Sequence, residues 1–133
     1  MEPASLDEFL KENHDAILAA VMVRMRGDED MAQVATKRDL TEADLNSQVL
    51  GFWLQGIRSD LTLGTTAAME QNMNWLKSLR SGHDLPFDGK AVRRCFAEIS
   101  AEIDSRLEDE EHLAEYSAFR AQVDRLISDS FPE

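Results

Sequence analysis

This sequence has only four residues that could ligate a metal ion through an imidazole nitrogen or a thiolate sulfur: His14, His83, His112 and Cys95. A structural zinc site needs four ligands, commonly in closely spaced pairs. These residues stand far apart, and no HxxxH, CxxC or HExxH spacing joins them. The GxSxG and Walker patterns of hydrolases and NTPases are also absent. The sequence therefore predicts no metal site, no catalytic residue and no enzyme.

Two of the histidines nevertheless lie on apolar faces of predicted helices. His14 falls among Leu10, Leu18 and Val21 in the first helix, and His112 falls on the apolar side of the last one. Such a histidine can be an axial ligand of haem iron or a half-buried side chain that is hydrogen-bonded to a neighbour. We expect the second and no bound cofactor; a haem-binding or other cofactor-binding globin-type sensor with His14 or His112 as ligand is the alternative.

The other residues with a chemical or ligand-binding interpretation are predicted to be structural. We expect Cys95 to be a buried free thiol that packs as a small apolar residue, and we expect His83 to lie in a solvated loop. Four methionines at helical spacing could line an adaptable ligand pocket, but they are more typical of core filling. These are Met22, Met25, Met69 and Met73.

Charge and composition restrict the partners and the compartment. The chain has 133 residues, a net charge of −12 and one cysteine. An acidic chain without clustered Lys and Arg is a poor match for nucleic acid or for an anionic membrane. The longest apolar run, residues 17–23, is far shorter than the about 20 residues of a membrane span. We expect a single cytoplasmic domain over residues 1–133. An acidic adaptor that binds a basic protein partner is a further alternative.

Helical periodicity runs through almost the whole sequence, and no alternating β pattern appears. Capping residues mark helix starts at Ser5, Asp28, Thr41 and Asp88. The sequence therefore predicts an all-α bundle of about five to six helices. Their predicted ranges are 6–26, a short 29–37, 41–61, 67–80, 89–107 and 112–129.

The helix over 41–61 carries too many apolar residues for a single neighbour. At the helical period its apolar positions sweep about 200° of the circumference. It is therefore either central, with neighbours on several sides, or part of a subunit interface. Gly56 lies inside this arc, where we expect the missing side chain to let another backbone come close. The arc consists of Leu45, Val49, Leu50, Phe52, Trp53, Leu54, Ile57 and Leu61.

The order of these signals resembles a family of bacterial sensory domains. A capped helix ends near VRMR, an LTEADL cap opens the apolar helix, a shorter helix ends in LKSLRSG, and DLPFDG opens the next. Over residues 6–128 this resembles the N-terminal sensory domains of RsbR-type stressosome proteins and related bacterial signalling proteins. The resemblance implies a globin-like fold without haem, a homodimer, and a last helix that leads outward to an output domain.

The same resemblance implies a function and an interface. We expect a non-enzymatic sensor that signals through the packing of dimer helices and acts on protein partners or a downstream output domain. The narrow apolar stripes of the last two helices look like the dimerising pair of such domains. The predicted dimer interface consists of Val92, Phe96, Ile99, Ile103, Tyr116, Phe119, Val123 and Ile127.

Overall fold

The computed structural model describes residues 5–83, 85 and 88–132, and all regular structure in these residues is helical. This confirms the all-α class. The elements are α1 (Leu6–Met25), α2 (Glu29–Arg38), α3 (Glu42–Leu45), the π-helical turn η1 (Asn46–Leu50), α4 (Gly51–Leu63), α5 (Ala67–His83), α6 (Gly89–Arg106) and α7 (Glu110–Ser130).

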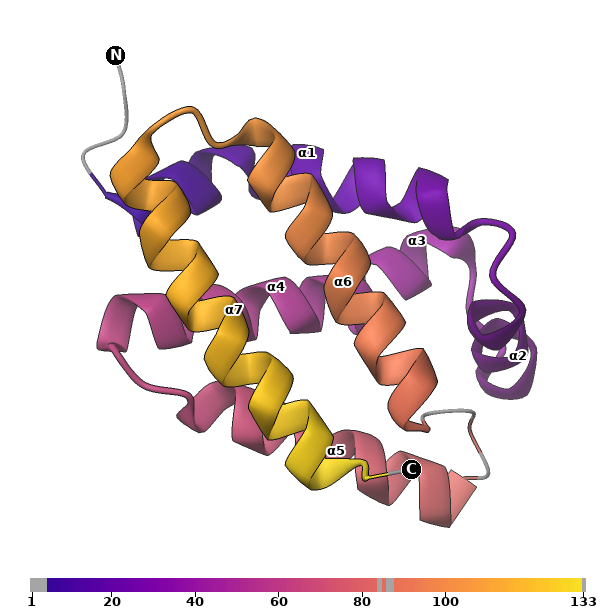
Figure 1. Ribbon diagram of the computed structural model, residues 1–133. Coiled ribbons are helices and arrows are strands. Elements are labelled where there is room, and N and C mark those ends of the chain that lie inside the picture. The colour runs from indigo at the N-terminus through magenta and orange to yellow at the C-terminus, as the bar shows by residue number, and fades with distance from the viewer. Residues whose placement is uncertain (1–4, 84, 86–87, 133) are drawn as a thin grey trace.

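The helices form two crossing layers (Figure 1). α1, α4 and α5 lie side by side in one layer, and the antiparallel pair α6 and α7 crosses over them. α2 lies apart at the edge of the bundle, near α3. Within the part of the chain that the structure describes, no helix has the length and apolar composition of a membrane span.

The helix starts are where the capping residues predict them. Ser5, Asp28 and Asp88 each accept a backbone N–H of the following first turn with a side-chain oxygen. Thr41 and Asp44 form a reciprocal capping box at α3. These bonds satisfy N–H groups that have no partner inside the helix.

Three ends differ from the prediction by more than one residue. α5, which we expected to end at Ser81–Gly82, runs on to His83, α4 runs on to Leu63, and α7 begins at Glu110, two residues before the predicted start. Residues 84, 86 and 87 of the predicted loop lie outside the described residues.

α4 is the central helix of its layer, between α1 and α5. Six of the eight residues of the predicted arc are buried, Leu61 is half-buried, and Phe52 is 40% exposed. Phe52 departs from the prediction because η1 inserts a wider turn, which advances the helix face by about one residue. The same shift turns Gly51 inward, where an added Cβ would lie 3.8 Å from Leu18 Cδ1.

Gly56 lies at a close contact between α4 and α5. An added Cβ would lie 2.6 Å from Asn72 Nδ2 and 3.3 Å from Met69 Sδ. The neighbours are therefore side chains of α5, and not another backbone. Asn72 is itself buried and fills the space that the glycine leaves.

The last helix does not lead outward as expected. α7 packs on α6, α5 and α1. Phe131, directly after α7, is fully buried, and its carbonyl oxygen accepts a hydrogen bond of 2.9 Å from Arg93 Nη2. Lys77 Nζ lies 5.9 Å from the centroid of the Phe131 ring. These contacts hold the end of α7 against α5 and α6.

Candidate functional site

The candidate site lies beneath α2, the helix with the least extensive packing. Asp28 begins α2 by accepting the Met31 N–H at 3.0 Å, and Asp39 ends it in the left-handed conformation at φ 54°. Only Met31 and Val34 of its ten residues are buried. The fully buried contacts of α2 with the bundle are therefore made by two side chains one turn apart, with the half-buried Ala35 packed beside them.

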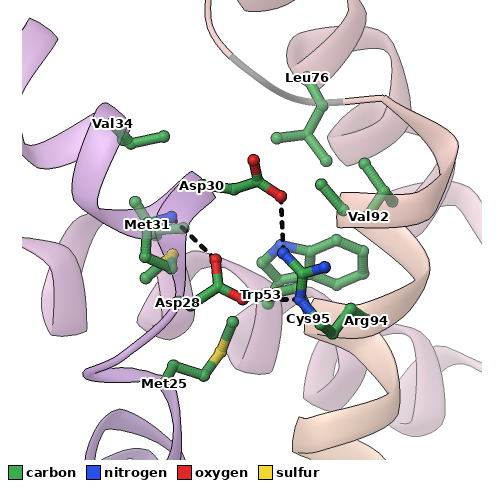
Figure 2. Close-up of a pocket in the computed structure, with 12 residues that line it drawn as sticks. Met25, Asp28, Asp30, Met31, Val34, Trp53, Leu76, Val92, Arg94 and Cys95 are labelled. Atoms are coloured by element: carbon green, nitrogen blue, oxygen red, sulfur yellow. Dashed lines mark hydrogen bonds and ion pairs between the residues drawn. The ribbon is translucent and has the colours of Figure 1, made fainter.

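A small apolar hollow of about 20 Å³ lies under these two side chains (Figure 2). The end of α1, α2, η1, α4, α5 and α6 all contribute to its walls. Trp53 forms part of the wall and stacks on Phe96 of α6, with ring centroids 5.9 Å apart. The apolar lining residues are Met25, Met31, Val34, Val49, Trp53, Leu76, Ala91, Val92 and Cys95.

Three charged residues lie beside this hollow and connect α6 to the start of α2. Arg94 Nη2 donates a hydrogen bond of 2.6 Å to Asp30 Oδ2, and Arg94 Nε lies 2.6 Å from Asp28 Oδ2 (Figure 2). The hydrogen bonds to Asp30 and Asp28 raise the pKa of Arg94 above its ordinary range. The pair with Asp30 is partly exposed to water, whereas Arg94 Nε and the Asp28 side chain, which is 11% exposed, are largely buried. A partly exposed pair contributes modestly to stability, and both pairs position α2 over the hollow.

A second hollow of about 50 Å³ adjoins the first on the other side of Val34. Val34 and Val49 line both hollows, so these two side chains form the partition. Trp75, Leu79 and Leu85 lie on the far wall. A displacement of α2 that carries Val34 away would join the two hollows into one apolar groove.

Cys95 contributes packing to this site and no reactivity. It is 7% exposed, and burial raises the pKa of its thiol to about 12. The thiol is therefore protonated at neutral pH, whereas nucleophilic and metal-binding cysteines act as thiolates. This agrees with the prediction of a buried free cysteine.

The two candidate cofactor ligands, His14 and His112, lie elsewhere. Neither is among the described residues that line the two hollows. His14 Nδ1 lies 3.2 Å from Arg58 Nη1, and because arginine only donates, Nδ1 is the acceptor. His112 lies in the first turn of α7, where its backbone N–H donates to Asp109 Oδ1. The described residues contain no group of three or more His, Cys, Asp or Glu that could hold a metal ion.

The Arg58 contact predicts the titration of His14. Burial and the Arg58 charge lower the pKa of His14 below its ordinary value of 6.5. The unfolded chain therefore binds a proton at a pH where the folded chain does not. The free energy of unfolding is therefore unaffected by His14 above pH 6.5 and decreases as the pH falls below 6.5, because the unfolded chain then takes up the proton more readily. An NMR titration should give a pKa below 6.5 that rises in Arg58→Gln; a value at or above 6.5 would contradict the contact.

The eight residues predicted as a dimer interface lie in the core of the single chain. Each of them is at most 6% exposed, and six are fully buried or nearly so against α1, α4, α5 or the other member of the pair. Side chains that their own chain covers have no surface left for a second one. In this conformation the eight residues do not form a subunit interface but pack between the two layers of the chain. They are Val92, Phe96, Ile99, Ile103, Tyr116, Phe119, Val123 and Ile127.

Sequence reasoning missed the charged residues that hold the helices together. Arg94 pairs with Asp30, 64 positions away, and Arg24 Nη2 pairs with the buried Glu102 at 3.0 Å. No local pattern marks such distant partners. The sequence predicted Asp28 only as a helix cap and gave no sign of its ion pair with Arg94. Comparison with models of known protein families, with curated proteins and with solved structures found no match to this chain.

Proposed function

We propose that this chain is a non-enzymatic sensory or regulatory domain of bacterial signal transduction, with a globin-like bundle that works without haem. The helix order that resembles RsbR-type stressosome proteins supports this proposal, as does the two-layer all-helical arrangement. We propose further that the domain responds to a small uncharged apolar molecule bound beneath α2, and that α2 acts as its lid.

The lid proposal depends on one observation: α2 covers an apolar hollow, but few of its side chains are buried against the bundle. Its buried side chains are Met31 and Val34, and its charged contacts include those of Asp28 and Asp30 with Arg94. The helix pairs α1–α6, α1–α4 and α4–α5 pack far more extensively. Elements with few buried contacts open at a lower free energy than the core. α2 is therefore the helix best suited to move while the other helices stay in place.

The size of the hollow requires that movement. A volume of about 20 Å³ accommodates roughly one water molecule, whereas a buried cavity that holds benzene measures about 150 Å³. Displacement of Val34 would join the two hollows and expose Trp53 and Trp75 along one groove. The ligand would thus bind the open state only, which is what a ligand needs in order to shift an equilibrium between two states.

The charges beside the hollow favour an uncharged ligand. An anion would lie against Asp28 and Asp30, and a cation would lie against Arg94. These groups already compensate one another through their ion pairs. Opening of α2 would separate them, so ligand binding would change both the position of α2 and the charges that it presents to a protein partner.

Toluene is a suitable probe for this proposal, because it is uncharged, apolar and of ring size. An NMR titration of the full chain should shift the amide signals of residues 28–38 and 91–95 together with the Trp53 indole signal. Val34→Ala removes part of the partition between the two hollows, and this variant should bind toluene roughly threefold or more tightly. Val123→Ala removes the same groups from the fully buried stripe of α7 and should leave toluene binding unchanged. Shifts confined to α7, or no shift in any of the three proteins, would overturn the proposal.

A further inference from the structure

A third hollow lies between the start of α1 and the end of α4, and it is open to the surface. Its volume is about 490 Å³, and it shares no lining residue with the two hollows beneath α2. The start of α1 and the end of α4 lie at the end of the bundle opposite α2 (Figure 1). Small-molecule sites have volumes of roughly 300–1,000 Å³. The lining residues are Asp7, Gln55, Arg58, Ser59, Thr62 and Leu63.

Arg58 supplies the positive charge of this hollow, and no carboxylate of the chain neutralises it. Its Nη1 donates one of the five guanidinium N–H groups to His14 Nδ1, 3.2 Å away. Within the part of the chain that the structure describes, Arg58 belongs to no ion pair, and its buried Nε has no hydrogen-bond acceptor. A half-buried cation without a carboxylate is costly. Arg58 is therefore available to a carboxylate that a ligand brings.

Asp7 supplies a negative charge to the same hollow from the first turn of α1. It is half-buried, and among the described residues it too belongs to no ion pair, with Arg58 or with any other cation. The first hollow is different, because Arg94 there is already matched by two carboxylates. Two opposite charges thus line the third hollow without neutralising each other.

We infer that this hollow binds a free amino acid, with the carboxylate of the ligand on Arg58 and its ammonium group on Asp7. A guanidinium can hold a carboxylate through two parallel hydrogen bonds. An ammonium group only donates, and the Asp7 carboxylate only accepts. Asp7 would repel a simple anion, and Arg58 would repel a simple cation. A zwitterion matches both charges and adds no net charge to a chain of −12.

Leu63 indicates which kind of amino acid fits this hollow. Its side chain lines the hollow at the end of α4 and is 72% exposed. An apolar side chain of the ligand that covered Leu63 would remove apolar surface of both from water. L-Leucine is therefore a suitable probe. The inference goes beyond the proposed function, which concerns an uncharged ligand and the movement of α2.

An NMR titration of the full chain with L-leucine tests the inference. Leucine should shift the amide signals of residues 58–63 and the ring signals of His14, which is bonded to Arg58, and should leave residues 28–38 unchanged. Two matched compounds each lack one charge of leucine: isocaproate lacks the ammonium group, and isopentylamine lacks the carboxylate. Each of them should bind roughly tenfold or more weakly than leucine.

Two variants separate the roles of the two charges. Asp7→Asn should weaken leucine binding roughly tenfold but strengthen isocaproate binding, because it removes both the partner of the ammonium group and the repulsion of the anion. A loss of structure would not change the two affinities in opposite directions. Arg58→Gln should weaken the binding of both compounds. Asp124→Asn and Arg125→Gln change exposed residues of α7 and should leave both affinities as they are.

Three results would overturn the inference: no shift at the third hollow with leucine at its solubility limit, isocaproate binding as tight as that of leucine, or leucine binding that Asp7→Asn and Arg58→Gln leave unchanged. None of them affects the toluene response of α2, because the two sites share no lining residue. Failure of this inference is therefore distinguishable from failure of the proposed function.

Discussion

Replacing Asp60 with alanine is expected to lower the free energy of unfolding by about 3 kcal/mol. Asp60 is 1% exposed near the end of α4, and its carboxylate accepts two backbone N–H groups from the first turn of α5. Ala68 N lies 2.8 Å from Oδ1, and Met69 N lies 2.9 Å from Oδ2. Hydrogen bonds to a charged group contribute about 1.5–3 kcal/mol each, and their loss leaves buried donors without partners.

Chemical denaturation measures this effect, and a melting temperature lower by about 10 °C should accompany it. Asp60→Asn keeps one carbonyl acceptor and should lose less than the alanine variant. Asp129→Ala removes an exposed carboxylate near the end of α7 and serves as the matched control, with no loss of stability. An Asp60→Ala variant as stable as the control would show that the α4–α5 turn does not depend on this carboxylate.

Replacing Phe131 with alanine is the second large expected loss, again about 3 kcal/mol. The side chain is fully buried although it follows the last helix, and its backbone is held by Arg93. The contact with Gly89 of α6 is tight, because a Cβ added at this glycine would lie only 2.9 Å from the Phe131 carbonyl oxygen. Truncation to alanine removes the ring from the space between α5, α6 and α7 and leaves a cavity.

Thermal and chemical unfolding measure this loss, with Ser128→Ala, an exposed position in the last turn of α7, as the control. The control variant should be as stable as the wild-type chain. A loss below about 1 kcal/mol for Phe131→Ala, the range of ordinary surface substitutions, would mean that the end of α7 is free to leave the bundle.

The helices were predictable because their signals are local. Ser5, Asp28, Thr41 and Asp88 lie within three residues of the N–H groups that they satisfy, and the structure confirms all four. The register of α4 was not predictable in the same way. A π-helical turn depends on packing against neighbouring helices, and it turned Phe52 outward and Gly51 inward.

The site depends on contacts between distant residues, and these leave no local signal. Asp60 belongs to α4, but its carboxylate accepts backbone N–H groups of the neighbouring α5. The stripes of α6 and α7 were misread because a narrow apolar stripe has the same spacing in a core as in a subunit interface. Only the presence of α1, α4 and α5 on the other side distinguishes the two, and that is a property of the fold.

Hydrogen exchange of the α2 amides is the measurement that tests the lid most directly. The account predicts that residues 31–38 of the free chain exchange through an opening much less costly than global unfolding, while Ile99 and Ile103 of α6 exchange only with global unfolding. It predicts that toluene changes the exchange of α2 and of Val92 but leaves α7 as it was. If α2 were protected as strongly as α6, and toluene changed neither, α2 would be a fixed part of the bundle and the proposed sensing mechanism would be wrong.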